Sequence, residues 1–212
     1  MPRAAPALVA LALGLGPAAA RADDPTRPLP LGPPPSSVDF LQYGAAYVAE
    51  SQLSVGPICV EEAEFPCIFG SGGGLAIRAG YRDHRGWYLG GAYEVSKHTS
   101  GNLLTLPTLQ QARAEGRWAL VLGQRFSPYV SLAAGVAAYG DEWAVATYGP
   151  LAAVGVGVEF ELAPQIFVGV APGYRAIALQ RWRGGDWHSP LGLAHFLSFE
   201  ITLEARRPLP RY

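Results

Sequence analysis

A hydroxyl and an imidazole lie two residues apart at His98 and Ser100, where they could act as a nucleophile and its base. Residues two apart in a β-strand lie on the same face of the sheet, so both side chains would point the same way. A serine activated by a neighbouring histidine is a usual basis of acyl transfer, and Glu94 or Glu115 is available to orient the imidazole. The motif lies where the strand pattern gives way to a loop, with Gly101-Asn102 directly after it, so a structural role for these residues is the competing interpretation.

The two cysteines of the chain, Cys59 and Cys67, lie close together in one segment. Nearby cysteines in an exported protein usually form a disulfide, and reactive thiols or metal ligands are the other interpretations. The four histidines have no spacing typical of a metal site, and the glycine-rich segment 70–74 lacks the Lys-Ser or Lys-Thr of a phosphate-binding loop. We therefore predict a disulfide between Cys59 and Cys67, no metal and no cofactor.

Arginine and glutamate recur at alternate positions in several segments, in equal number. Residues with this spacing share one face of a strand, where buried opposite charges can pair and satisfy each other's hydrogen bonds. The residues with this pattern are Arg78, Arg82, Glu94, Arg113, Glu115, Arg117, Arg125, Glu159, Glu161, Arg175, Glu200 and Glu204. We predict that they form an ion-pair network inside a sheet that closes on itself.

The segment 151–175 shows most clearly which elements position these side chains. Val154, Val156 and Val158 alternate with Gly155 and Gly157, a period of two that is typical of a strand with one bulky and one small face. The same alternation predicts eight strands, near residues 38–47, 75–82, 87–95, 111–126, 130–137, 151–162, 166–175 and 193–204. The fold class is therefore all-β.

Short and long connections alternate between these strands. The short ones lie near Asp83, at Ser127-Pro128 and near Pro164, and the long ones cover approximately 51–71, 98–110, 141–150 and 180–190. An even number of antiparallel strands with short turns at one end and long loops at the other is the construction of an outer-membrane barrel. We predict an eight-stranded antiparallel up-and-down transmembrane β-barrel with short periplasmic turns and long extracellular loops.

The N-terminus has the pattern of a secretory signal. Arg3 precedes an apolar run to about Ala20, and Ala20-Arg21-Ala22 resembles a cleavage site. A membrane-anchoring helix is the alternative, although the run is short and contains Gly and Pro. We predict a signal peptide at 1–22 with cleavage near Ala22, a proline-rich periplasmic linker at 23–37, the barrel at 38–206 and a C-terminal tail at 207–212.

Size and charge indicate which face of the sheet lies inside. Eight strands enclose a space that side chains nearly fill, so the glycine-rich and charged face suits the lumen and the bulky apolar face suits lipid. A lumen plugged by Arg and Glu pairs is the structural interpretation, and a charged pore is the functional one. The aromatic residues near the short turns are Tyr81, Trp87, Phe126, Phe160 and Phe167, and those near the long loops are Tyr47, Tyr93, Tyr139, Trp143, Tyr148, Tyr174, Trp182 and Trp187. These two groups resemble the aromatic girdles of membrane barrels, and the alternative is the core of a soluble β-sandwich.

The chain resembles the small eight-stranded outer-membrane barrels of Gram-negative bacteria, the OmpA-type and OmpX-type group, over roughly 38–206. This resemblance implies an outer-membrane location, contact with outer-membrane lipid, and insertion by the barrel assembly machinery. Such barrels usually end their last strand with an aromatic residue, whereas here residues 205–212 follow the predicted strand and end at Tyr212. His98-x-Ser100 is similar to the His-x-Ser of outer-membrane lipid A deacylases.

These observations predict a structural or surface-interaction protein whose loops contact an extracellular ligand. The candidate contacts in the loops are Trp182, Arg183 and Trp187, because aromatic and arginine side chains are frequent interface anchors. The alternative for this segment is that it anchors the rim of the barrel at the membrane interface. A small channel for ions or apolar solutes is the alternative, and an esterase similar to the lipid A deacylases, using His98 and Ser100, is the second. We expect no enzyme activity, and the net charge of −1 gives no electrostatic reason for a nucleic-acid partner.

Overall fold

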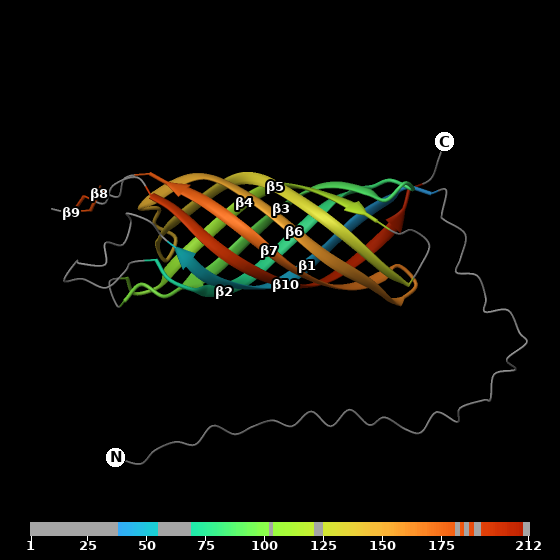
Figure 1. Ribbon diagram of the computed structural model, residues 1–212, viewed down its shortest axis with the longest axis horizontal. Coiled ribbons are helices and arrows are strands. Elements are labelled where there is room, and N and C mark those ends of the chain that lie inside the picture. The colour runs from blue at the N-terminus through green and yellow to red at the C-terminus, as the bar shows by residue number, and fades with distance from the viewer. Residues whose placement is uncertain are drawn as a thin grey trace, which may run out of the picture. The chain divides into compact units, whose positions relative to one another are not determined.

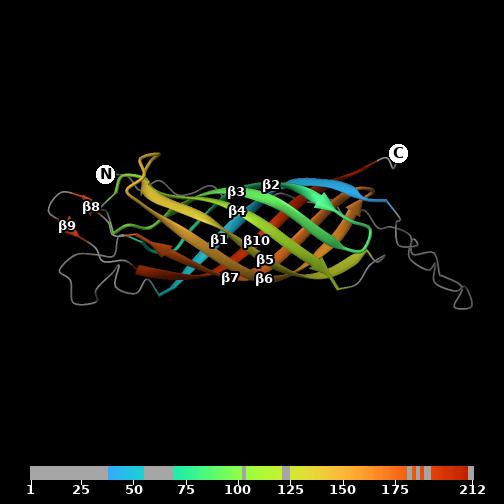
Figure 2. The same cartoon turned by 90° about the horizontal axis from the view of Figure 1, so that it is seen from above.

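The computed structural model places eight antiparallel strands in a closed barrel, seen from two directions in Figures 1 and 2. It describes residues 38–54, 69–101, 104–120, 125–180, 183–184, 187–188 and 192–209. The chain divides into two units, Met1–Leu31 and Gly32–Tyr212, and every described residue belongs to the second. The predicted fold class and the number of strands in the barrel are confirmed.

The barrel strands are β1 (Phe40–Ser54), β2 (Gly72–Arg82), β3 (Trp87–His98), β4 (Pro107–Ala119), β5 (Phe126–Asp141), β6 (Thr147–Ala163), β7 (Ile166–Leu179) and β10 (Gly192–Pro208). They follow one another around the barrel in the order β1-β10-β7-β6-β5-β4-β3-β2. The two short strands β8 (Arg183–Gly184) and β9 (Trp187–His188) form a separate two-stranded sheet in the connection between β7 and β10. This small hairpin lies in a segment that was predicted to be a loop, at approximately 180–190.

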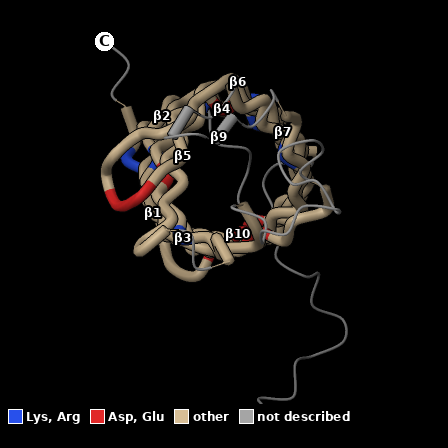
Figure 3. Tube along the Cα trace, turned by 90° about the vertical axis from the view of Figure 1, so that its left-hand side faces the viewer, with Lys and Arg blue, Asp and Glu red and all other residues tan. Residues whose placement is uncertain are grey.

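The first and last strands close the barrel. β1 pairs with β10 from Phe40 opposite Pro208 to Ser54 opposite His195, and the Leu209 N–H donates to the Asp39 carbonyl oxygen at 2.8 Å. Figure 3 looks along the barrel and shows the resulting ring. The start of β1 and the end of β10 therefore lie at the same end of the barrel as the connections 83–86, 120–125 and 164–165, and we call it the turn end. The opposite end, with connections 55–71, 99–106, 142–146 and 180–191, is the loop end.

The period-two pattern sorts side chains between the two faces of the wall as predicted. Outward-facing side chains such as Leu75, Trp87 and Leu132 are exposed and apolar, whereas Glu94, Arg117 and Arg175 are buried inside. Because every second residue points inward, charges spaced two or four apart converge on the interior from different strands. No helix in the part of the chain that the structure describes is long and apolar enough to cross a bilayer.

The turn between β2 and β3 follows directly from its residues. Asp83 accepts hydrogen bonds at Oδ1 from the Arg85 N–H at 3.0 Å and the Trp87 N–H at 2.7 Å, which is the usual behaviour of aspartate at a turn. Gly86 has φ of 91°, a conformation that glycine adopts without steric cost. The predicted tight turn at Asp83–Gly86 is therefore confirmed.

The boundary between the fourth and fifth strands was predicted wrongly. β4 ends at Ala119 and the connection covers 120–125, whereas Ser127 and Pro128 lie inside β5, opposite Glu159 and Val158. Arg125 is consequently exposed at the turn end and does not face the interior. At the other limit of the barrel, β10 continues to Pro208, two residues beyond the predicted end at Arg206.

The ladder between β6 and β7 lacks two pairs in its middle, in addition to a register shift between Glu161 and Ala163. Pairing stops after Gly155 opposite Gly173 and resumes at Val158 opposite Val170, so Pro172 lies in the unpaired stretch. Proline has no N–H and cannot donate to a ladder. On its other side Pro172 still lies opposite Phe199 of β10, so the wall is continuous but less well bonded at this point.

Candidate functional site in the barrel interior

The interior next to the turn end holds a group of four residues that we call the turn-end layer: Gln42, Arg82, Glu159 and Arg206. Arg82 Nη1 donates to both oxygens of Glu159, at 2.8 and 3.1 Å, and Arg206 Nη2 donates to the same carboxylate. Arg206 Nε donates to Gln42 Oε1 at 2.9 Å. One buried carboxylate thus neutralises part of the charge of two guanidinium groups, with an amide completing the hydrogen bonds.

Further along the axis, six residues form the middle layer: Arg78, Arg113, Glu115, Arg117, Glu200 and Glu204. Arg78 Nη2 donates to Glu200 at 2.5 Å, and Arg113 bridges Glu115 at 2.8 Å and Glu200 at 3.0 Å. These contacts join strands β2, β4 and β10 across the interior, so they connect parts of the wall that are not neighbours. Each such pair is stabilising only because several hydrogen bonds offset the cost of removing both charges from water.

Arg117 of this layer contacts two tyrosine rings as well as a carboxylate. Its Nη1 donates to Glu204 at 2.9 Å, and its guanidinium carbon lies 4.9 Å from the centre of the Tyr88 ring and 5.4 Å from that of Tyr129. Both distances are in the range of a cation–π interaction. Tyr88 in turn packs against the bare backbone of Gly80 and Gly90.

The loop-end layer is formed by Glu50, Glu94, Ser96, His98, Gln111 and Arg175. Arg175 Nη1 donates to Glu50 and Glu94 at 2.7 Å each, and its Nη2 donates to Glu200 of the middle layer at 2.6 Å. Gln111 Nε2 donates to Glu50 at 3.2 Å and to Glu94 at 3.1 Å. Arg175 therefore connects the middle and loop-end layers.

His98 has both ring nitrogens in contact with groups other than Ser100. Nδ1 lies 2.7 Å from the Gly70 carbonyl oxygen, and Nε2 lies 3.0 Å from both Glu50 Oε2 and Ser96 Oγ. Since a carbonyl oxygen only accepts, Nδ1 must carry the proton that it shares with Gly70. His98 thus fixes the end of the β1–β2 connection to the loop-end layer.

The esterase arrangement considered from the sequence does not form. The Ser100 hydroxyl donates to the carbonyl oxygen of Leu104 at 3.4 Å and accepts from its N–H at 3.2 Å, and Glu94 and Glu115 both bind arginine rather than His98. The side chains of Ser96, His98 and Glu50 do contact one another, but all three are buried in the interior of the barrel. A general base needs contact with its nucleophile in a position that substrate can reach, and this geometry provides neither for Ser100.

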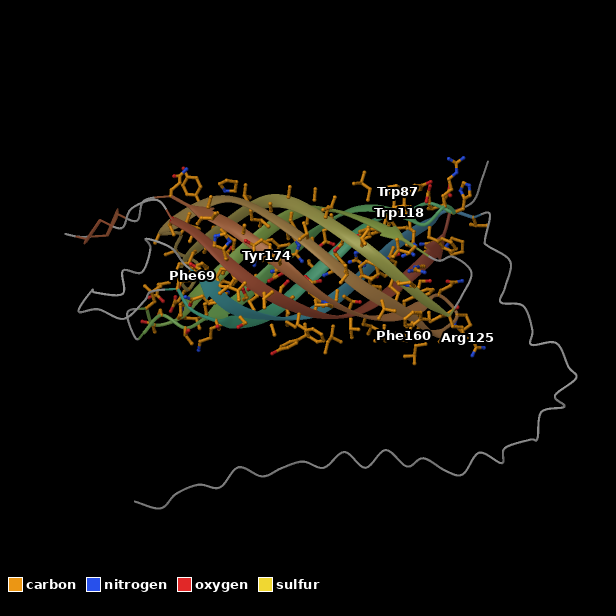
Figure 4. The ribbon with its side chains drawn as sticks, viewed as in Figure 1. Phe69, Trp87, Trp118, Arg125, Phe160 and Tyr174 are labelled. Carbon is orange, nitrogen blue, oxygen red and sulfur yellow. The ribbon has the colours of Figure 1, made fainter. Side chains whose placement is uncertain are left out.

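An apolar cluster closes the interior at the loop end, and we call it the apolar plug. It consists of Phe69, Leu109, Ala137, Tyr139, Leu151, Ile177, Leu179, Ala194 and Phe196. Phe69, marked in Figure 4, packs with its ring centre 4.4 Å from that of Tyr139 and 5.1 Å from that of Phe196. It comes from the β1–β2 connection, whose end is held by hydrogen bonds of Gly70 and Ser71 to Thr99.

Ten of the twelve charged residues predicted to line the interior form ion pairs there. The two exceptions are Arg125, which is exposed in the β4–β5 connection, and Glu161, which is half-buried near the rim of the barrel. Glu161 takes part in none of the salt bridges found among the described residues. Glu50 and Arg206 take part instead, although the sequence analysis did not name them. Six arginines and six glutamates therefore pair in the interior, joined by His98.

The aromatic residues at the two ends only partly follow the predicted girdles. At the turn end Trp87 and Trp118 stack outside the barrel with ring centres 5.5 Å apart, and Phe126 and Phe160 pack at 5.1 Å (Figure 4). At the loop end, however, Tyr139 points inward and belongs to the apolar plug, so its predicted place in the outer girdle is wrong.

The predicted disulfide and part of the predicted loop contacts fall outside the part of the chain that the structure describes. Cys59, Cys67 and Trp182 lie outside the described residues, and for Arg183 and Trp187 only the strand positions in β8 and β9 are described. Within the described ranges no group of three or more His, Cys, Asp or Glu side chains could hold a metal ion.

The chain matches no protein-family model, and no curated protein matches it in sequence. Solved structures with a similar fold include Neisserial surface protein A, 15% identical with a TM-score of 0.54, covering 79% of this chain and 96% of that one. The outer membrane protein OprG from Pseudomonas aeruginosa is 12% identical, with a TM-score of 0.55 and coverage of 81% and 96%. Outer membrane protein AlkL in lipid bilayers is 13% identical, with a TM-score of 0.53 and coverage of 89% and 99%. This protein therefore has the fold of small eight-stranded outer-membrane barrels.

Proposed function

We propose that this protein is a barrel of a Gram-negative outer membrane whose filled interior makes it a rigid support for the connections at the loop end. The connections at that end then form the working surface, facing the outside of the cell, and contact an extracellular ligand. The proposal includes cleavage of the signal peptide near Ala22, insertion by the barrel assembly machinery, and contact of the wall with outer-membrane lipid.

The outer surface supports a membrane location. Exposed leucine, isoleucine, valine and aromatic side chains cover the wall, including Leu75, Ile77, Leu89, Leu132 and Val136. In water such a continuous apolar surface would cause association, whereas in lipid it is favourable. A closed barrel also pairs each strand with a neighbour on both sides and so leaves no open sheet edge, which a bilayer requires.

The observation that carries the proposal is the filling of the interior by three charged layers and an apolar plug. Arg113, Arg117 and Arg175 cross the lumen to carboxylates on other strands, and Phe69 and Phe196 pack beyond them at the loop end. A filled lumen leaves no wide path for solutes, so the connections at the loop end are the part of the barrel that we propose to be functional. His98 and Ser100 have no catalytic role in this proposal, because the first is occupied in holding Gly70 and the second binds Leu104.

Cysteine labelling on intact cells tests both the membrane location and the orientation. In a background with Cys59→Ser and Cys67→Ser, Trp143→Cys places a thiol at the loop end, where Trp143 is 70% exposed. Arg85→Cys is the matched variant at the turn end. We expect an impermeant maleimide to label the first variant on whole cells and the second only after lysis. Labelling of Arg85→Cys alone on whole cells would reverse the orientation, and recovery of the protein as a soluble periplasmic monomer would overturn the proposal.

A second candidate function is passage of apolar solutes through the wall, favoured by the interruption at Pro172. A groove of about 380 Å³, lined by exposed Leu197 and Phe199, shares Pro172, Gly173 and Ser198 with an interior cavity of about 40 Å³. The wall separating an outer groove from the interior is therefore weakest where the ladder is interrupted.

Uptake of an apolar fluorescent probe by cells tests this second candidate. If solutes pass at Pro172, cells with the protein take up the probe faster than cells without it, and Pro172→Ala, which restores an N–H donor, slows uptake. Pro150→Ala is the control, because Pro150 is an exposed proline of β6 that lies opposite Val136 of β5, away from the gap at Pro172. Equal uptake with and without the protein removes this candidate and leaves the rigid support.

A further inference from the structure

An interior cavity of about 40 Å³ lies against the middle layer and is surrounded mainly by positive charge. The charged side chains that line it are Arg78, Arg113, Glu115, Arg117, Arg175 and Glu200. Four guanidinium groups therefore face two carboxylates around this space. The interior as a whole is balanced, with six arginines and six glutamates paired, so the excess of positive charge is local to the cavity.

Arg78 is the arginine of this group with the fewest partners. Its Nη2 donates to Glu200 at 2.5 Å, whereas its Nη1 lies 3.7 Å from Glu115 and 3.8 Å from Glu204, beyond hydrogen-bond distance. Its Nε is buried and has no acceptor among the described protein atoms. A guanidinium has five N–H donors, and a buried donor without an acceptor costs free energy of about 1 to 3 kcal/mol.

The other side of the cavity is formed by small residues of β5, β6 and β7. Ala133, Ala153, Gly155 and Ala171 present little side-chain volume, and Ser131 adds a hydroxyl. A water molecule needs roughly 10 to 15 Å³ of such space, so the cavity has room for roughly three waters or for one small ion with some hydration. A polyatomic anion with a bulky organic part does not fit.

We propose that this cavity binds a small monovalent anion of halide size, with Arg78 as its principal ligand. Charge-assisted hydrogen bonds from guanidinium to an anion are stronger than those to water, and the low dielectric of the interior increases the attraction. Four surrounding guanidinium groups exclude a cation. The inference depends only on the interior of the barrel, so it holds whichever function the loop end performs.

Crystallography with bromide tests the site without any variant. The barrel is refolded in bromide, because the apolar plug and the charged layers would slow entry into the folded protein. We expect an anomalous peak within hydrogen-bond distance of Arg78 Nε. Density explained by water alone, or bromide peaks found only outside the barrel, would overturn the proposal.

Unfolding in matched salts is the second measurement. The wild type is refolded and unfolded in sodium chloride and in sodium gluconate of equal ionic strength, since gluconate is too large for the cavity. Binding to the folded state alone lowers the unfolding equilibrium constant by the factor 1 + [Cl⁻]/Kd, about 100-fold at 100 times Kd. We expect a higher unfolding midpoint in chloride.

Arg78→Gln and Arg82→Gln form a matched pair for this experiment. Both arginines come from β2 and are similarly buried, at 5% and 6% exposure, but Arg82 does not line the cavity. We expect Arg78→Gln to lose the difference between chloride and gluconate and Arg82→Gln to keep it. A wild-type midpoint that is the same in both salts, or an unchanged difference in Arg78→Gln, would contradict anion binding.

Discussion

At the scale of single residues, the charged side chains of the interior depend on one another more than on any one strand. Glu159 shows this most clearly, because it accepts hydrogen bonds from Arg82 on β2 and Arg206 on β10 while it belongs to β6. Removing a shared partner leaves the remaining charges buried, and that penalty is larger than the net gain of the pair itself.

We predict that Glu159→Ala lowers the free energy of unfolding by about 3 to 5 kcal/mol, because Arg82 and Arg206 lose their common carboxylate. Glu142→Ala removes an exposed carboxylate in the β5–β6 connection and is expected to change stability by less than about 0.5 kcal/mol. Urea unfolding in detergent, followed by tryptophan fluorescence, measures both. Equal losses in the two variants would show that the Glu159 carboxylate is not held in a buried pair.

Two adjacent glycines give a second prediction, on packing. A Cβ at Gly90 would lie 2.3 Å from Tyr88 Oη and 2.5 Å from the Ala79 carbonyl oxygen, whereas at Gly91 the nearest atom is 3.7 Å away. Gly90→Ala should therefore displace the tyrosine that covers Arg117 and cost about 1 to 3 kcal/mol, the usual range for overpacking. Gly91→Ala faces outward and should be close to neutral. Unfolding midpoints that fall equally in both variants would argue against this placement of Tyr88.

Parity along the strands accounts for most of what the sequence could predict about these residues. Glu50 lies an even number of residues after Gln42, and Arg206 lies two after Glu204, so the same rule would have placed both inside. Arg125 was misplaced because alternation continues past Ala119 into the connection, and nothing in the pattern marks the end of β4. Glu161 has the right parity but lies near the rim, a position that depends on the tilt of the barrel.

At the scale of elements, the gap in pairing between β6 and β7 makes this part of the wall irregular. Val156 and Gly157 have no partner in the β7 register, and Ala171 and Pro172 none in that of β6. The ladder between β2 and β3, in contrast, is continuous from Gly72 to Arg82. Local opening has a lower free-energy cost where ladder hydrogen bonds are missing.

We therefore predict faster amide hydrogen exchange at Val156, Gly157 and Ala171 than at Ile77 and its neighbours in β2. Pro172→Ala should slow exchange at the first three residues, because the new N–H can donate to the ladder. Exchange measured by NMR or mass spectrometry on the folded barrel reports this directly. Uniform exchange around the barrel, or no change in Pro172→Ala, would mean that the wall is equally bonded throughout.

Two predictions about elements were wrong or incomplete, one on the facing of Tyr139 and one on the β7–β10 connection. The outward-facing residues of β5, Val130, Leu132 and Val136, have even numbers, so the odd-numbered Tyr139 should face inward. It was instead assigned to the outer aromatic girdle because it lies close to a long loop. The β8–β9 hairpin was missed because its strands have two residues each, too short for a period to be visible. Strand number and facing could be predicted, whereas strand ends and insertions from loops could not.

At the scale of the whole molecule, the interior of the barrel is filled by successive groups of side chains from one end to the other. The turn-end, middle and loop-end layers of paired charge follow one another, and the apolar plug lies at the loop end, where Phe69 enters from a connection rather than from a strand. The sequence predicted the charged layers but not the plug, because Phe69 is outside the predicted strands. Its position depends on the hydrogen bonds that the next two residues, Gly70 and Ser71, make with His98 and Thr99.

We predict that the purified protein migrates at two positions on a denaturing gel, one for the unheated and one for the boiled sample. A barrel whose first and last strands are paired along their length should resist detergent until it is heated. The protein should also sediment with the outer-membrane fraction. A single band at all temperatures, together with recovery in a soluble fraction, would contradict a closed barrel in a membrane.

The most direct test of the central claim is the electrical conductance of the purified barrel in planar lipid bilayers. The paired charges and the apolar plug predict no stable, reproducible conductance steps, in bilayers where insertion has been verified by recovery of the heat-modifiable band. Reproducible wild-type steps that disappear when an interior small residue is enlarged, as in Ala133→Leu, would show a continuous path along the lumen and contradict the filled interior.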